Sequence, residues 1–311
     1  MKERNKINKP IFIIGCPRSG TGIFHQLLRL HPDIAWITPV TNRCFSLKYG
    51  KFYENPSTAK YIQNIVKYLP DILVPKKYSG PYDGSLKIKF QYETNEGHAI
   101  WNSFCPLEDH YLDENDLSDE AVNYFRKVVK GHLEIFNKSR FVNKMPHNSM
   151  RIRYISGIFP DAKFIHIIRN PRAVINSILN RRVVENENVN DWWGVKPPNW
   201  KDYKNKNSFK QVVNQWYYTI EIINKDRKIL RDDQYFEIKY EDLMDEPEMI
   251  MDEVINFAEL RKSKKFKNEL FQYKNKLEDK NYKSNKKFSD GEKREIKKIC
   301  NKYLVNYGYV I

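Results

Sequence analysis

The sequence has few cysteines and no long apolar run. Only four of its 311 residues are cysteine, namely Cys16, Cys44, Cys105 and Cys300, and no two of them form a Cys-x-x-Cys pair. This spacing argues against a zinc site and against a disulfide framework, so we expect four reduced thiols. Residues 1–9 are polar and charged, and no apolar stretch of signal-peptide or membrane-span length follows them. These absences predict a soluble protein of the cytoplasm.

The sequence also has fewer acidic than basic residues. The formal net charge is +15, and residues 261–298 carry fifteen basic against six acidic residues. Such an excess favours anionic partners in general and selects none of them. A solvated helical surface explains it as well, and we favour that interpretation over a specific nucleic-acid partner.

The length and a hydrophobic content of 41% suffice for one large core. We therefore expect a single domain over residues 1–311. Within it, residues 186–207 form an aromatic insertion and residues 261–288 form a basic segment.

Near the amino end, a strand, a glycine-rich loop and a helix follow one another. Ile11–Ile14 is a short apolar run typical of a buried strand, residues 15–20 have turn composition, and Ile23, Leu27 and Leu30 recur at helical spacing. Such a loop directs its N–H groups and the first helical turn at one point, where a phosphate binds well.

The loop lacks two residues that a nucleotide kinase needs. Gly15 and Gly20 have Walker A spacing, but Thr21 and Gly22 replace the Lys and Ser/Thr that follow the second glycine in that motif. Arg18 offers a planar cation suited to phosphate oxygens instead.

Further strands alternate with helices. Strands are predicted at residues 140–143, 163–168 and 235–239. This alternation predicts a three-layer, P-loop-like α/β fold with a central parallel sheet flanked by helices. Ligands gather at the carboxyl ends of such strands, where Lys144 and Arg169 would lie.

Arg169 stands where a Walker B aspartate would be expected, so the sequence argues against a metal-dependent kinase. Pro171 begins the next helix, and Ser177 lies about two turns into it. Arg169 and Ser177 are therefore candidates to share one anion.

Further helices are predicted at 119–136 after Ser118, at 147–159, at 209–230, at 249–260 and, after the capping box Ser289–Glu292, up to about residue 307. The acidic residues at 241–246 are interpreted as caps of the helix predicted at 249–260.

Two segments carry candidate acceptor-side residues. Residues 91–101 combine carboxylates, a histidine and aromatic rings, and Glu96 and then His98 are the candidate general bases. Two structural roles are equally open at this point: Glu96 as the cap of a turn, and His98 as a satisfied, partly buried histidine. In the aromatic insertion, Trp192, Trp193 and Trp200 suit either a lid or pocket wall or a small satellite core.

Three segments, taken in this order, resemble the sulfotransferases that use 3′-phosphoadenosine 5′-phosphosulfate (PAPS). Pro17-Arg18-Ser19-Gly20-Thr21 resembles the family's 5′-phosphosulfate loop, and residues 163–177 resemble its 3′-phosphate motif. Asn143-Lys144-Met145-Pro146 with residues 159–164 is similar to the branch that includes the protein-tyrosine sulfotransferases. Tyr240-Glu241-Asp242-Leu243 also matches the family's pattern.

The resemblance implies sulfuryl transfer from PAPS to a hydroxyl or amine, with PAP as the second product and no metal. It implies that Arg169 and Ser177 bind the 3′-phosphate, that residues 17–22 bind the 5′ side, and that Lys144 contacts the transferring group. A second Thr or Ser commonly follows the position of Thr21, and Gly22 lacks that hydroxyl.

The acceptor implied is a small molecule, lipid, carbohydrate or peptide. The resemblance supplies no base, so Glu96 and His98 are candidates on their chemistry alone. Two alternatives remain: a kinase-like phosphotransferase and a non-catalytic binder of polyanions.

Overall fold

The centre of the molecule is a sheet of five parallel strands in the order β2-β3-β1-β4-β5. The computed structural model describes residues 7–48, 54–66, 93–185, 188–274, 277–279, 281 and 288–309. Its strands are β1 (Ile11–Ile14), β2 (Ile34–Trp36), β3 (Arg140–Lys144), β4 (Lys163–Ile168) and β5 (Tyr235–Lys239). The expected parallel sheet is confirmed, and β1 lies at its middle, between β3 and β4.

Helices follow the strands along the chain. The α-helices are α1 (Thr21–Leu28), α2 (Pro39–Cys44), α3 (Pro56–Val66), α5 (His98–Trp101), α6 (Asp119–Phe136), α7 (Ile152–Ile158), α8 (Pro171–Glu185), α9 (Ser208–Asp226), α10 (Tyr240–Asp245), α11 (Pro247–Phe257), α12 (Lys264–Lys274) and α13 (Asp290–Asn306). The 3-10 helices are η5 (Glu114–Asp116), η6 (Pro146–Met150), η7 (Trp200–Asp202), η8 (Arg227–Ile229) and η9 (Asp232–Gln234).

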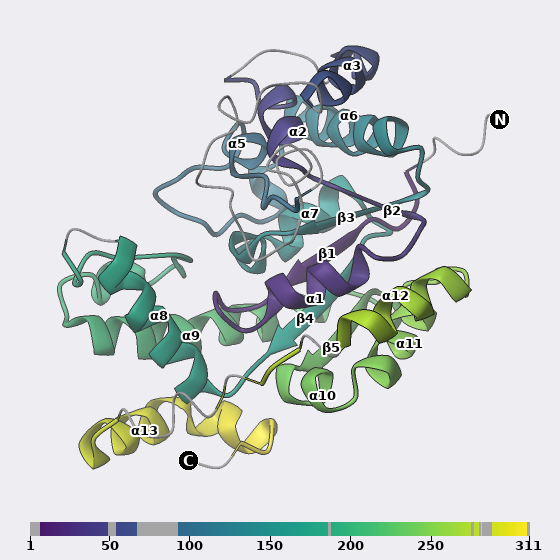
Figure 1. Cartoon of the computed structure of the whole chain (residues 1–311). Helices are drawn as coiled ribbons and strands as arrows, with labels where there is room; N and C mark the ends of the chain where they lie inside the picture. Colours follow the sequence, from purple (N-terminus) through teal and green to yellow (C-terminus); the bar gives the residue numbers. More distant parts are fainter. Residues whose placement is uncertain are drawn as a thin grey trace.

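Alternate residues of β1 pack into cores on opposite faces of the sheet, as the period of a strand requires. Phe12 and Ile14 join the core formed with α5, α6 and α7. Ile11 and Ile13 join the core formed with α1, α11 and α12. Figure 1 shows the sheet between these two groups of helices, with α8, α9 and α13 gathered beyond one end of it. The three-layer prediction is confirmed.

The predicted helix at residues 147–159 is interrupted. Residues of η6 form one 3-10 segment, and α7 begins after Arg151, whose φ of −136° departs from helical geometry. The interruption places Ser149 against the glycine-rich loop, where its hydroxyl bonds both the N–H and the C=O of Gly15 at 2.9 and 3.0 Å. A contact 134 positions away along the chain therefore overrides the local helical pattern.

Other helix bounds differ less. The helix predicted at 209–230 is α9, which ends at Asp226, and the one predicted at 249–260 is α11, which begins at Pro247. Of the acidic residues at 241–246 interpreted as caps, those up to Asp245 belong to a helix of their own, α10, and Glu246 holds the N-cap position of α11. The caps of α6 and α13 are confirmed, because Ser118 accepts from the N–H of Ala121 and Ser289 from that of Glu292.

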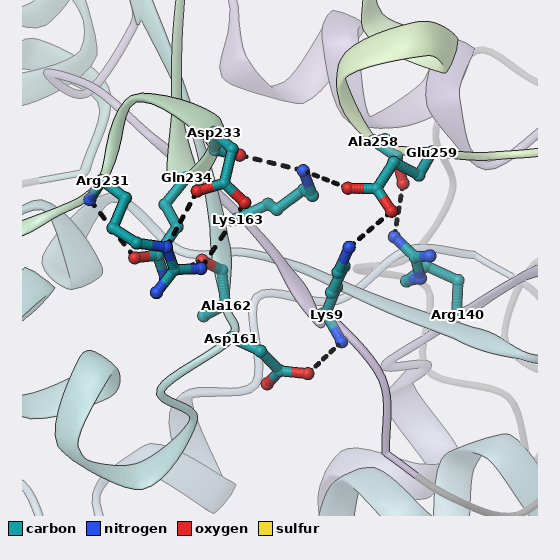
Figure 2. Close-up of polar contacts among 10 residues, drawn as sticks. All are labelled: Lys9, Arg140, Asp161, Ala162, Lys163, Arg231, Asp233, Gln234, Ala258 and Glu259. Carbon is teal, nitrogen blue, oxygen red and sulfur yellow. Dashed lines mark hydrogen bonds and ion pairs between the residues drawn. The ribbon is translucent and has the colours of Figure 1, made fainter.

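Charged residues tie the amino ends of the central strands to the turn after α11. Figure 2 shows Lys9, Arg140 and Lys163 around Ala258 and Glu259. The Glu259 carboxylate pairs with Lys9 Nζ at 2.5 Å and with Lys163 Nζ at 2.9 Å, and Arg140 donates to the Ala258 carbonyl at 2.5 Å. These contacts hold β1, β3 and β4 together at the edge opposite the glycine-rich loop.

None of the helices in the described ranges is long and apolar enough to cross a lipid bilayer. Parts of the two predicted special segments, residues 186–187, 275–276, 280 and 282–287, lie outside the described residues. The single-domain organisation remains a prediction.

Candidate functional site

The glycine-rich loop connects β1 to α1 and has little room for side chains. A Cβ on Gly15 would lie 2.5 Å from the Ile167 carbonyl oxygen, and one on Gly20 would lie 2.3 Å from the ring of Tyr240. Gly20 is also the residue before α1 and has φ +98°, which favours glycine. Sequence and packing therefore agree on why glycines stand at both ends of this loop.

The loop leads directly into the first turn of α1, where amide groups have no acceptor within the helix. Thr21 and Gly22 occupy that turn and line a cavity at the carboxyl edge of the sheet. Apart from its chain neighbours and the backbone of α1, no atom of the described residues lies within 4 Å of a Cβ built on Gly22. The helix terminus therefore faces open space that suits an anionic group.

Arg18, Arg169 and Ser177 meet at this loop. Arg18 Nε donates to Ser177 Oγ at 3.0 Å, and Arg169 Nη1 donates to the carbonyl oxygen of Arg18 at 3.2 Å. Partial desolvation, followed by the charges of Arg181 and Arg169, lowers the pKa of Arg18. Neighbouring guanidinium groups repel each other, so an anion between them would be strongly stabilised. The structure brings the predicted pair, Arg169 and Ser177, to one place.

Arg169 is held from several directions and is only 7% exposed. Its Nε donates to Asn281 Oδ1 at 2.7 Å, and its guanidinium carbon lies 4.0 Å from the ring centroid of Tyr240. Asn281 in turn donates to the Glu241 carboxylate at 2.8 Å. Arg169 is thereby fixed at the strand end with part of its donor set facing the cavity.

Lys144 lies at the end of β3, and its ammonium forms an ion pair with the carboxylate of Glu96. The other carboxylate oxygen of Glu96 lies 3.0 Å from His98 Nε2. Burial raises the pKa of Glu96, but Lys144 and His98 outweigh it and hold that pKa well below its usual range. Glu96 does not cap α5, because Gly97 occupies the cap position. The two candidate bases thus touch each other, and Glu96 also touches the lysine.

Two further histidines, which no sequence pattern distinguishes, lie beside His98. The His147 ring packs edge-on against His98 at 5.2 Å and stacks on His110 at 3.8 Å between centroids. His110 Nδ1 accepts a bond from the N–H of Lys196 at 3.0 Å, which ties this group to the aromatic insertion. Burial lowers the pKa of His110 to about 3, so its imidazole is neutral at physiological pH.

One cavity of about 990 Å³ joins these groups. Its wall includes every predicted site residue except Ser19: Pro17, Arg18, Gly20, Thr21, Gly22, Glu96, His98, Lys144, Arg169 and Ser177. Ser19 is turned inward, since its N–H donates to the Cys16 carbonyl at 3.1 Å and its hydroxyl lies against Gly15.

The aromatic insertion contributes to the cavity as well. Trp192 and Trp193 belong to its wall, whereas Trp200 packs on Trp192 at 5.6 Å and donates to Asp109 at 3.1 Å. The insertion therefore forms a pocket wall and a small packed cluster together. Within the ranges that the structure describes, no three His, Cys, Asp or Glu side chains are grouped so that they could hold a metal ion.

Comparison with known proteins agrees with this geometry. The profile described as "Sulfotransferase family" matches residues 10–55 and 81–264. Protein-tyrosine sulfotransferase A of Caenorhabditis elegans is 22% identical over 262 residues, which are 82% of this chain and 51% of that protein. The omega-hydroxy-beta-dihydromenaquinone-9 sulfotransferase Stf3 of Mycobacterium tuberculosis is 22% identical over 256 residues, 77% of this chain and 60% of that protein.

The chain thus spans about half to three fifths of the length of these relatives. Among solved structures, sulfotransferase STF9 from Mycobacterium avium superposes with a TM-score of 0.60 at 15% identity, over 97% of this chain and 77% of that one. Sulfotransferase STF1 from Mycobacterium tuberculosis gives a TM-score of 0.55 at 14% identity, over 86% and 72%. At such identities the likeness establishes the fold.

Proposed function

Because the chain belongs to the sulfotransferase family, we propose that it transfers a sulfuryl group from PAPS to a hydroxyl or amine, with release of PAP. The observation that carries this proposal is the convergence of Arg18, Arg169 and Ser177 on the loop before α1, in one cavity with Lys144 and Glu96. Two anionic ends and a reacting centre need such an arrangement. Directly after β4 stands Arg169, where a magnesium site would need a carboxylate.

The residues have separate roles in this proposal. Arg18, Thr21 and the first amides of α1 hold the 5′ side, and Arg169 with Ser177 holds the 3′-phosphate. Bound PAPS supplies a sulfuryl group whose S–O bond to the 5′-phosphate breaks, with the electron pair left on the phosphate oxygen. Lys144 places positive charge beside that centre, and Glu96 accepts the proton from the acceptor oxygen or nitrogen as it bonds to sulfur.

The acceptor is proposed to lie on the side of the cavity lined by the histidines and by Trp192 and Trp193. The relatives named above act, by their names, on protein tyrosine and on a hydroxylated menaquinone. A peptide, lipid, carbohydrate or small-molecule hydroxyl therefore forms the panel to be tested. A cytoplasmic location remains a prediction.

Calorimetric titration with PAP, against ATP with Mg²⁺, tests the donor site in the wild type and in Arg169→Ala. Removing a charged hydrogen-bond partner costs about 1.5–3 kcal/mol, so we expect PAP binding to weaken roughly 10- to 150-fold in the variant. Transfer of label from [³⁵S]PAPS to the acceptor panel then tests the reaction. ATP–Mg²⁺ binding without PAP binding would favour a kinase, and salt-sensitive heparin binding that survives Arg18→Ala, without PAP binding, would favour a polyanion binder.

A further inference from the structure

We infer that Asn143 is a positioning residue that holds Glu96 at the reaction centre while Lys144 moves from the Glu96 carboxylate to the sulfuryl donor. This inference rests on the proposed function. Asn143 immediately precedes Lys144 on β3, so one strand end supplies both the lysine and the anchor of the base.

The side-chain amide of Asn143 is fully buried and held in one orientation. Its Oδ1 accepts from the indole N–H of Trp101 at 3.1 Å and from Asn148 Nδ2 at 3.0 Å. An indole nitrogen can only donate, so the oxygen must face Trp101 and the NH₂ group must face the other way. There Asn143 Nδ2 donates to the backbone carbonyl of Glu96 at 3.0 Å.

The main chain around Glu96 is also fixed on its other side. The N–H of Asn95 donates to the Ile37 carbonyl at 2.7 Å, and Gly97 has φ +85° with the Ile37 side chain packed so closely that a Cβ would lie 2.6 Å from it. Glu96 is thus held between β3 and the residue that follows β2. This anchorage acts through the backbone and is independent of the charge on the carboxylate.

Lys144 and Glu96 neutralise each other in the absence of donor. A negatively charged group that enters the same cavity attracts Lys144 and repels Glu96, so the ion pair weakens when the donor binds. The Glu96 carboxylate then loses its ion pair with Lys144 while it must still remain near the acceptor. The hydrogen bond from Asn143 to the Glu96 carbonyl is retained and keeps Glu96 in place.

The movement of Lys144 away from Glu96 should change the number of protons bound by the protein, and this number can be measured. Lys144 and His98 hold the pKa of Glu96 low against the effect of burial, and departure of Lys144 leaves burial to act in the opposite direction. Glu96 should therefore take up a fraction of a proton when donor binds at mildly acidic pH. The titratable or charged groups that act on it are Lys144, His98, Arg18, His25 and His147.

Calorimetry of PAPS binding at pH 5.5, in buffers of different ionisation enthalpy, counts these protons without any acceptor. The 3′-phosphate also exchanges protons, but it does so equally in Glu96→Gln, so the wild type minus this variant isolates Glu96. A rise of the Glu96 pKa when Lys144 leaves appears in that difference as proton uptake, which we expect to be on the order of tenths of a proton. Glu96→Gln is expected to bind PAP at least as tightly as the wild type does, because the variant lacks a negative charge that repels the ligand and pairs with Lys144.

Asn143→Ala is expected to bind PAPS within about threefold of wild type yet to lose more than half of the Glu96-dependent uptake, because the released carboxylate follows Lys144 or turns to solvent. Asn214→Ala removes another buried amide, one that bonds the Lys210 carbonyl at 2.8 Å on α9, and should leave the uptake unchanged. A general loss of packing would lower the stability of both variants and leave the proton count unaltered.

Equal uptake in the wild type and in Glu96→Gln would show that Lys144 stays on Glu96. Full uptake in Asn143→Ala would show that Asn143 does not hold the base. Either result overturns the inference while leaving the donor site intact, whereas a failure of the wild type to bind PAP overturns the proposed function. Should Asn143→Ala not fold, Asn143→Asp retains the acceptor for Trp101 and removes the donor to Glu96, with Asn143→Asp/Glu96→Gln as its reference.

Discussion

Gly22→Ser should tighten the binding of PAP. Gly22 is the second residue of α1 and lines the cavity. Beyond its chain neighbours and the backbone of α1, no atom in the described part of the chain lies within 4 Å of a Cβ built there. A serine therefore fits without displacing any neighbour, and its hydroxyl would face the anion proposed to bind at this helix terminus. The resemblance to sulfotransferases leads one to expect a hydroxyl at this position.

The size of the effect follows from two contributions. A hydrogen bond from a neutral donor to a charged group is worth about 1.5–3 kcal/mol, which corresponds to roughly 10- to 150-fold in affinity. Part of this is spent in ordering the side chain, so we expect about tenfold. Replacing glycine within a helix also stabilises the fold by roughly 0.5 kcal/mol, and this contribution leaves the affinity unchanged.

Gly22→Ala separates the two contributions, because it adds the Cβ and the helix propensity but no hydroxyl. The dissociation constants of PAP for the wild type and both variants are measured by calorimetry, and the unfolding free energies by urea denaturation. If Gly22→Ser binds PAP no more tightly than Gly22→Ala does, the hydroxyl does not contact the anion. Weaker binding by both variants than by the wild type would also contradict the prediction, since the ligand itself would then need the space beside Gly22.

Two predictions concern stability. Asp226 is buried at the last residue of α9, burial raises its pKa from 3.8 to about 6, and the folded state therefore retains a proton that the unfolded state releases between these values. Folding stability falls as the pH rises through this window, so Asp226→Asn should stabilise the protein by about 1–3 kcal/mol at pH 8 and have little effect at pH 4, as measured by urea denaturation. Bonds from Lys9 and Lys163 lower the pKa of Glu259 to about 2, so its stabilising contribution is present above the ordinary carboxyl pKa and is lost as the pH falls towards 2. Glu259→Gln should cost about 1–2 kcal/mol at pH 7, because it removes the ion-pair partner of the buried Lys163 ammonium; equal midpoints for variant and wild type at pH 7 would contradict this.

The strands and the donor side were predictable because local patterns encode them. Apolar runs identify the buried strands, and parallel strands end at one edge, so Lys144 and Arg169 had to lie on the same side as the loop after β1. The strand order is a different matter: β1 lies between β3 and β4 because of how the sheet packs, and no local pattern states it. The break between η6 and α7 is not predictable from the local sequence for a similar reason, since the Ser149 hydroxyl hydrogen-bonds the backbone of Gly15, 134 positions away.

The acceptor side of the cavity consists mainly of loops and short helical turns rather than strands and long helices. For this reason the residue types of Glu96 and His98 identify them as candidate bases, but no sequence pattern predicts which residues surround them. Residues 93–112 and 191–200 have no repeating hydrophobic pattern. Individual hydrogen bonds between residues far apart in the chain hold them in place, such as those from Asn143 to Glu96 and from Lys196 to His110. Donor recognition depends on strand ends and on one helix terminus, which the fold itself supplies. Acceptor recognition depends on loops that are hydrogen-bonded to the core of the fold at a few positions. Because the loop sequence can change while these hydrogen bonds remain, the same fold can accommodate different acceptors. The residues that make these hydrogen bonds, rather than the loop residues, hold the base beside the donor.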